Sequence, residues 1–308
     1  MKGLNQSHFV SASDGLRLHV RMYGASDGGR LPVVCLPGLS RNGSDFDALG
    51  EALSRTPGKS RRVLAVDMRG RGLSEYDSNP ANYSLPVELG DVAAVVTALA
   101  AEPAIFVGTS RGGILTMLLA ALRPTAIAGA VFNDIGAVIE NKGVMRIKGY
   151  VGKLPQPKNI EDGAEILRRL FSAQFTRFTQ DEWIDQARRN WWNKGGKLVP
   201  AYDPALSKTL ADADLERPLP ALWAQFDALP KVPVMVIRGE HSDILSAETV
   251  AAMAARGRDL TTFEVEGEGH PPRLEGGLIG DIAAFAERCD IAARPHLVNA
   301  GRSGYDRP

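Results

Sequence analysis

The sequence has little of several features that would each indicate a particular class of protein. Its 308 residues include two cysteines, Cys35 and Cys289, too few for the disulfide framework of a secreted domain. Lysine plus arginine and aspartate plus glutamate each number 36, so the net charge is zero and nothing favours nucleic acid or an anionic lipid surface as a partner. No apolar run approaches the roughly 20 residues that a membrane-spanning helix needs. We therefore expect a globular protein that contacts neither nucleic acid nor membrane.

The beginning of the chain gives no sign of export. Residues 1–7 contain no long apolar core of the kind found in a secretory signal. We expect a cytoplasmic protein in which Cys35 and Cys289 are reduced residues of the hydrophobic core. No cluster of cysteine and histidine has the spacing of metal ligands, so the sequence predicts neither a metal nor another cofactor. It leaves open whether the chain forms a homodimer.

The most informative stretch that is present is Gly-x-Ser-x-Gly at residues 108–112. An apolar, β-prone run precedes it and a helix-like run, 114–121, follows it. In this context the pattern is typical of a nucleophile elbow, a strained turn that lifts a serine hydroxyl above the edge of a sheet. The N-terminus of the following helix would point free N–H groups at the same place. The pattern predicts Ser110 as a nucleophile.

Short apolar segments alternate with helical segments along much of the chain, which predicts an α/β fold with a mostly parallel central sheet flanked by helices. The Asp14-Gly15 pair predicts a leading hairpin. We expect that hairpin over 8–23, strands over 31–36, 62–66, 105–107, 127–133, 232–239 and 261–266, and helices over 45–54, 86–100, 114–121 and 274–289.

The pattern changes between residues 136 and 229, where helical periodicity dominates and strand signals are nearly absent. We interpret this segment as a helical cap inserted into an α/β core of residues 1–135 and 230–290, and residues 291–308 as a polar tail. All four tryptophans lie in the predicted cap. Trp192 and Trp223 are predicted to line an apolar substrate pocket, although packing among the cap helices is the simpler explanation for any one tryptophan.

A serine hydroxyl becomes a good nucleophile when a base takes its proton, and histidine titrates in the right range. Of the five histidines, two lie in the predicted hairpin and one in the tail. His241 and His270 each follow a late strand, where the loops gather at the edge of the sheet that carries Ser110. His270 sits in a rigid loop between Gly269 and Pro271, and we favour it as the base.

A carboxylate must orient the imidazole and stabilise its positive charge. Asp243 follows a late strand and gives the chain order Ser110, Asp243, His270, which is the order of this architecture. Two other carboxylates compete with it. Asp134 follows the strand after the elbow and is also placed to reach the histidine, and Glu240 is close to Asp243 in sequence. We favour Asp243 and keep Asp134 as the alternative.

Acyl transfer also needs two N–H donors aimed at the developing oxyanion. One is expected from Arg111, the residue after the nucleophile. The other is expected from Leu39, because Gly38 lets the loop after strand 31–36 pass close to the serine.

Taken together, these segments resemble the α/β-hydrolase superfamily. The resemblance covers about residues 8–289, with the cap as its variable part, and implies Ser110, Asp243 and His270 as a catalytic triad and Leu39 and Arg111 as oxyanion donors. One departure is Pro37-Gly38, where the family often has His-Gly. The segments that carry the resemblance are residues 108–113, 36–41 and 67–74, Asp243, and Gly269-His270.

The resulting hypothesis is a serine hydrolase that cleaves a small or medium apolar carboxylic ester through an acyl-enzyme. The same residues also suit hydrolysis of a carbon–carbon bond in a β-diketone or ring-cleavage product, or hydrolysis of a lactone. A third possibility, from another class, is a ligand sensor that keeps the triad and turns over slowly.

Overall fold

A computed structural model describes residues 5–25, 29–211 and 214–300. Its centre is an eight-stranded sheet with the order β1-β2-β4-β3-β5-β6-β9-β10. The strands are β1 (Asn5–Ser11), β2 (Arg17–Tyr23), β3 (Val33–Leu36), β4 (Val63–Val66), β5 (Ala104–Thr109), β6 (Ile127–Asn133), β9 (Val234–Gly239) and β10 (Leu260–Val265).

The sheet is mostly parallel, as the alternation of segments predicts. The hairpin β1–β2 is antiparallel and joins β4 antiparallel, while every other pair in this sheet is parallel. Strands β3 to β6 are buried along their whole length. Such uninterrupted apolar strands are expected where helices cover both faces of a sheet.

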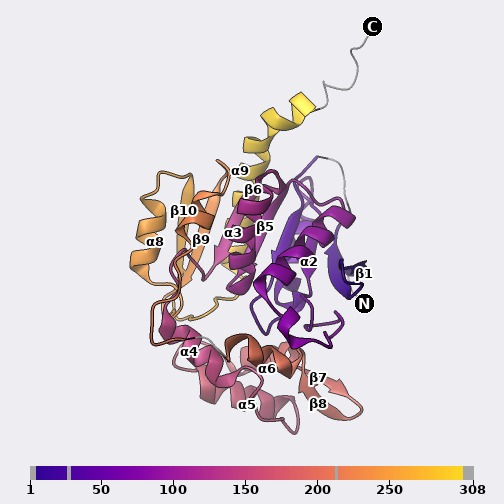
Figure 1. Ribbon diagram of the computed structural model, residues 1–308, viewed down its shortest axis with the longest axis vertical. Helices are drawn as coiled ribbons and strands as arrows, with labels where there is room; N and C mark the ends of the chain where they lie inside the picture. Colours follow the sequence, from indigo (N-terminus) through magenta and orange to yellow (C-terminus); the bar gives the residue numbers. More distant parts are fainter. Residues whose placement is uncertain (1–4, 26–28, 212–213, 301–308) are drawn as a thin grey trace.

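Helices do cover both faces (Figure 1). The helices α2 (Leu85–Ala98), α3 (Arg111–Leu122) and α8 (Ala247–Ala254) bury apolar side chains in the cluster on one face, and α1 (Asp47–Arg55) and α9 (Gly277–Ala300) do so on the other. Cys35 and Cys289 are free thiols buried in this second cluster, where burial raises the pKa of both. The core placement of the two cysteines is confirmed.

The C-terminal helix is longer than predicted. We expected it to end at Cys289, but α9 continues to Ala300, so part of the predicted tail is helical. Residues 301–308 of that tail lie outside the described residues. Across the ranges that the structure describes, no helix combines the length and the apolar character needed to cross a membrane.

The segment between β6 and β9 begins with three helices that gather beyond the lower end of the sheet in Figure 1, whereas its last helix packs on α3 in the core. It contains α4 (Asn141–Tyr150), α5 (Ile160–Phe171), α6 (Gln180–Asn190) and the short α7 (Trp223–Asp227). A capping box of Thr179 and Glu182 begins α6, and the Asn159 side chain caps α5.

The segment that we expected to be helical, with strand signals nearly absent, also contains a short strand pair. Strands β7 (Trp191–Lys194) and β8 (Lys197–Pro200) form an antiparallel hairpin after α6. Its turn is Gly195-Gly196, with φ of 59° and 81° at the two glycines. A Gly-Gly pair between β-prone residues is the sequence signal for such a hairpin.

Candidate active site

Ser110 lies in the sharp turn between β5 and α3, with φ 50° and ψ −116°. A non-glycine residue at positive φ is strained, and such strain persists only where the surrounding structure holds it. The neighbouring glycines leave no room for a side chain: a Cβ on Gly108 would lie 2.6 Å from Gly113, and one on Gly112 would lie 2.1 Å from the Leu36 carbonyl oxygen. The elbow predicted from the sequence is therefore present.

His270 reaches the serine from the loop after β10. Its Nε2 lies 2.9 Å from Ser110 Oγ, and the residue is buried. The loop is held in place from β6, because Asn133 Nδ2 donates to the Pro272 carbonyl at 3.0 Å. It also packs directly on the end of β9, where a Cβ on Gly239 would meet the Gly269 carbonyl oxygen at 2.4 Å. The predicted meeting of the two side chains is confirmed.

Asp134 is the carboxylate that contacts the histidine. Its Oδ2 lies 2.8 Å from His270 Nδ1, and the side chain is fully buried. Asp134 also accepts hydrogen bonds from Ser242 Oγ at 2.6 Å and from the Gly239 amide at 2.9 Å. The residue itself is at positive φ, 54°. Its orientation is thus fixed by the end of β9 and the loop that follows that strand.

The preference for Asp243 is wrong, and the alternative that the sequence left open holds. Both carboxylate oxygens of Asp243 accept hydrogen bonds from Arg146 of α4, at 2.7 and 2.8 Å. Burial opposes ionisation of Asp243, but the contact with Arg146 outweighs it and lowers the pKa of this carboxyl. Because β6 lies between β5 and β9 in the sheet, Asp134 at the end of β6 is the nearer neighbour of Ser110.

The two predicted amide donors border the serine. Arg111 is the first residue of α3, and the loop that carries Leu39 passes in van der Waals contact, since a Cβ on Gly38 would lie 3.6 Å from Ser110 Cβ. The amides of Leu39 and Arg111 donate no hydrogen bond to another described residue. Both N–H groups therefore remain available to a ligand.

A second hydrogen-bonded series of serine, histidine and aspartate lies elsewhere in the molecule. Ser7 Oγ is 2.9 Å from His19 Nε2, and His19 Nδ1 is 2.8 Å from Asp67 Oδ2. Here the serine lies in an edge strand rather than a strained turn, and no helix begins at it. Asp67 also accepts from the amides of Gly43 and Leu73, so this series fixes the loop after β4. The comparison shows that the elbow, rather than the three residue types, distinguishes the site.

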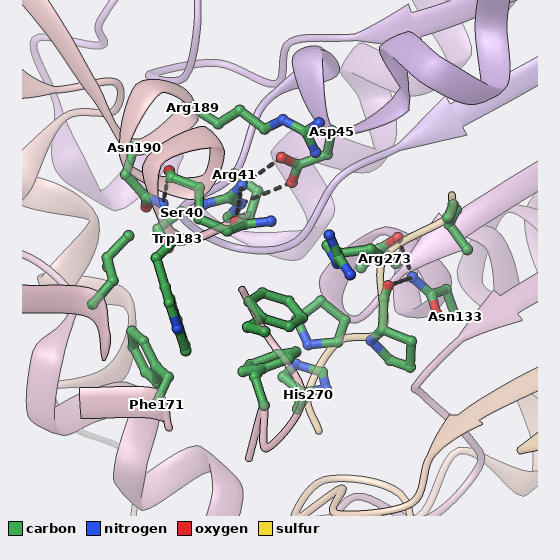
Figure 2. Close-up of a pocket in the computed structure, with 18 of the residues that line it drawn as sticks. Ser40, Arg41, Asp45, Asn133, Phe171, Trp183, Arg189, Asn190, His270 and Arg273 are labelled. Carbon is green, nitrogen blue, oxygen red and sulfur yellow. Dashed lines mark hydrogen bonds and ion pairs between the residues drawn. The ribbon is translucent and has the colours of Figure 1, made fainter. Parts of the chain in front are cut away.

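A cavity of about 110 Å³ adjoins His270 (Figure 2). One part of its wall is aromatic and comes largely from α5, α6 and the residues between them. Another part is polar and includes the guanidinium groups of Arg41, Arg189 and Arg273. The lining residues used below are Tyr150, Phe171, Phe175, Phe178 and Trp183 on the aromatic side, and Arg41, Asp45, Gln186, Arg189, Asn190 and Arg273 on the polar side.

The two tryptophans predicted to line the pocket do not line this cavity. Trp192 lies in the hairpin β7–β8, and Trp223 packs on Phe226 with Arg256 over its ring, 4.1 Å from the ring centroid. Trp183 is the tryptophan in the cavity wall. An apolar residue type in a predicted cap does not by itself say which side chain meets the cavity.

Comparison with known proteins gives consistent matches. Residues 33–278 match the model of a family described as the alpha/beta hydrolase family. The 3-hydroxybutyrate-oligomer hydrolase of Cupriavidus necator is 34% identical over 247 residues, which make up 78% of this chain and 82% of that protein. The 2-hydroxymuconate semialdehyde hydrolase of a Pseudomonas species is 27% identical over 245 residues, or 76% and 80% of the two chains. The crystal structure of an alpha/beta hydrolase from Novosphingobium aromaticivorans superposes with a TM-score of 0.84 at 36% identity, covering 94% of this chain and all of that one.

Proposed function

Because the chain belongs to the alpha/beta hydrolase family, we propose that it is a serine hydrolase that cleaves carboxylic esters through an acyl-enzyme. The observation that carries the proposal is the continuous hydrogen-bonded chain from Ser110 through His270 to Asp134, with the serine in a strained elbow. A hydroxyl, an imidazole and a buried carboxylate in this order form the arrangement that activates a serine for attack on an acyl carbon.

In the first half of the proposed reaction, Ser110 Oγ attacks the ester carbonyl carbon while His270 Nε2 takes the hydroxyl proton. The carbonyl oxygen becomes an oxyanion and accepts hydrogen bonds from the amides of Leu39 and Arg111. Asp134 accepts a hydrogen bond from the Nδ1–H group of the ring and stabilises the imidazolium. His270 then gives its proton to the alcohol oxygen, and the alcohol leaves.

In the second half, water replaces the alcohol. His270 takes a proton from this water as the water attacks the acyl carbon, and a second oxyanion forms at the same two amides. Collapse of this intermediate returns the proton to Ser110 Oγ and releases the acid. We propose that residues 136–229 act as a cap in this reaction, because α5, α6 and the residues between them supply most of the aromatic wall beside His270.

The proposed substrate is a short ester of a hydroxy acid that ends in a free carboxylate. The Cupriavidus relative is named for 3-hydroxybutyrate oligomers, whose units are joined by such esters. The cavity wall suits this chemistry. Arg41 is engaged by Asp45 and Arg273 by three glutamates, whereas within the described ranges Arg189 forms a single ion pair, with Glu275, through one nitrogen at 2.7 Å. Arg189 therefore has guanidinium nitrogens left for a substrate carboxylate.

Carbon–carbon bond hydrolysis stays as the second candidate. The likeness to the Pseudomonas 2-hydroxymuconate semialdehyde hydrolase extends over three quarters of this chain. The same serine, histidine and aspartate would serve that reaction with a carbon leaving group. The two candidates differ in the bond that breaks, so a substrate panel separates them.

The test is a panel of 3-hydroxybutyrate dimer and trimer, their methyl esters, p-nitrophenyl butyrate, lactones and β-diketones, with Ser110→Ala as the control. We expect wild-type protein to hydrolyse the esters, to prefer the free-acid dimer over its methyl ester, and to lose all of this activity in Ser110→Ala. Turnover of the diketones with poor ester hydrolysis would reverse the ranking. Ester hydrolysis that survives in Ser110→Ala would refute the proposed nucleophile.

A further inference from the structure

A cluster of two arginines and one glutamate adjoins the elbow, with Glu88 and Arg71 buried and Arg111 partly buried. Glu88, in the first turn of α2, is fully buried and accepts from Arg111 Nε at 2.5 Å with one carboxylate oxygen. With its other oxygen it accepts from Arg71 Nη1 at 2.6 Å. Arg71 is itself 1% exposed. One carboxylate thus binds two guanidinium groups, one from the loop after β4 and one from the residue that follows Ser110.

Through Arg71 the cluster also contacts Leu39, the residue that carries the other oxyanion-binding amide. Arg71 Nε donates to the Leu39 carbonyl oxygen at 2.7 Å. The carbonyl and the amide of Leu39 flank the same α-carbon, so fixing the carbonyl restricts the direction of the N–H. Arg111 supplies both the side chain that Glu88 binds and the amide that follows Ser110.

We propose that Glu88 is a positioning residue that sets the distance and direction between the two oxyanion-binding amides, those of Leu39 and Arg111. The inference rests on the proposed function, since it assigns those amides to the oxyanion. The bridge runs from the Leu39 carbonyl through Arg71, Glu88 and Arg111. Preorganised donors stabilise the transition state only while their geometry is fixed. This bridge fixes the positions of the two amides relative to each other.

The net charge of the cluster also favours formation of the oxyanion. Two guanidinium groups and one carboxylate leave one net positive charge beside the place where the oxyanion develops. Burial raises the pKa of Glu88, but the charges of Arg71 and Arg111 outweigh burial and lower it overall, so the carboxylate stays ionised at neutral pH. The cluster therefore keeps its bridge and its net charge at neutral pH.

The same helix supplies a matched control. Asp91 is also buried, one turn further along α2, and it binds Arg69 with both oxygens at 2.6 Å. Neither of these two side chains contacts Leu39 or Arg111. Arg69 meets the bridge through its backbone carbonyl, which accepts from Arg71 Nη1 at 2.6 Å. Asp91→Asn therefore removes a comparable buried charge from α2 and leaves in place the hydrogen bonds that join Leu39, Arg71, Glu88 and Arg111.

The experiment compares Glu88→Gln, Asp91→Asn and wild type, each checked for folding by circular dichroism and thermal unfolding. For Glu88→Gln we expect kcat on the best ester to fall about 10- to 100-fold, less than the roughly 100- to 1,000-fold loss when a whole oxyanion donor is removed. KM should change little, and the inhibition constant of a boronic acid, which forms a tetrahedral adduct on the serine, should rise by the same factor as kcat/KM falls. The pH profile of kcat/KM should keep its shape, because Ser110, His270 and Asp134 are intact.

Asp91→Asn should lose stability and keep its kcat. A folded Glu88→Gln enzyme with wild-type kcat, or an equal loss of kcat in Asp91→Asn, would overturn the proposal. If Glu88→Gln does not fold, Arg111→Met removes one arm of the bridge and retains the amide, and the same kcat and boronic-acid criteria apply. If wild type hydrolyses no ester, the proposed function fails separately, and the boronic-acid affinities of wild type and Glu88→Gln still decide whether Glu88 positions the amides.

Discussion

Two aspartates follow the carboxyl ends of neighbouring strands, Asp134 directly after β6 and Asp243 in the loop after β9, and they have different partners. Asp134 gives one oxygen to His270 and Ser242 and the other to the Gly239 amide, while Asp243 gives both oxygens to Arg146. At the scale of the residue, these hydrogen-bond partners decide which aspartate serves the imidazole. Asp134 is oriented toward the imidazole, and Asp243 joins α4 to the loop after β9.

Replacing these aspartates one at a time tests this assignment. In Asp134→Asn we expect kcat/KM to fall by about 10,000-fold, because an amide in this position favours the wrong tautomer of the His270 ring. In Asp243→Asn we expect less than roughly tenfold change in kcat/KM, with a loss of stability from the unpaired Arg146. Steady-state kinetics and urea unfolding measure both. A larger kinetic loss in Asp243→Asn than in Asp134→Asn would contradict the assignment.

At the scale of the element, the elbow depends on how closely β5, α3 and β3 approach one another. Gly112 is the tightest of these contacts, because the Leu36 carbonyl that it faces belongs to a buried strand and cannot move aside. Gly90, in the interior of α2, has nothing within 4 Å of the place where a Cβ would be. The two glycines are therefore present for different reasons.

Alanine substitution at these two glycines should have opposite effects on stability. Gly112→Ala should lower the free energy of unfolding by roughly 3 kcal/mol or more, because the new methyl group overlaps backbone that cannot yield. Gly90→Ala should raise it by roughly 0.5–1 kcal/mol through reduced freedom of the unfolded chain. Urea unfolding followed by fluorescence gives both values. Equal stability of the two variants would show that the backbone around Gly112 can move enough to accommodate a methyl group.

At the scale of the whole molecule, α9 is tied to the segments that lead into β3 and β4. Asp290 accepts from Arg61 Nη1 and Nη2 at 3.3 and 3.0 Å and from the Leu31 amide at 3.0 Å. Arg61 is 2% exposed and Asp290 8%. Lys59 and Glu287 form a second pair between the same regions, 2.6 Å apart, but on the surface.

Breaking the buried pair should therefore matter far more than breaking the surface pair. Asp290→Asn should lower the free energy of unfolding by about 3–5 kcal/mol, because it leaves the buried charge of Arg61 uncompensated. Glu287→Gln should have a much smaller effect, since water and salt already screen that pair. Thermal and urea unfolding compare the variants, and kcat per folded molecule should be unchanged in both. Similar losses of stability would show that α9 is not held by the buried pair.

The sequence by itself determined the parts of this protein that depend on local chain geometry. Strand and helix periodicity predicted the sheet and most helices, and the spacing of Gly108, Ser110 and Gly112 predicted the elbow, because a turn this tight admits few residue types. His270 followed from its place after the last strand. These features are encoded within short stretches, and neighbouring residues in the chain are sufficient to specify them.

Only the tertiary structure decided between Asp134 and Asp243, and between Trp183 and the tryptophans predicted to line the pocket. The ends of β6 and β9 are adjacent in the sheet, so strand order alone allows either carboxylate to reach His270. The choice depends on Arg146, which binds Asp243 from α4, nearly a hundred residues away in the chain. Side-chain direction and partners distant in sequence set these outcomes, and neither is encoded in a local pattern.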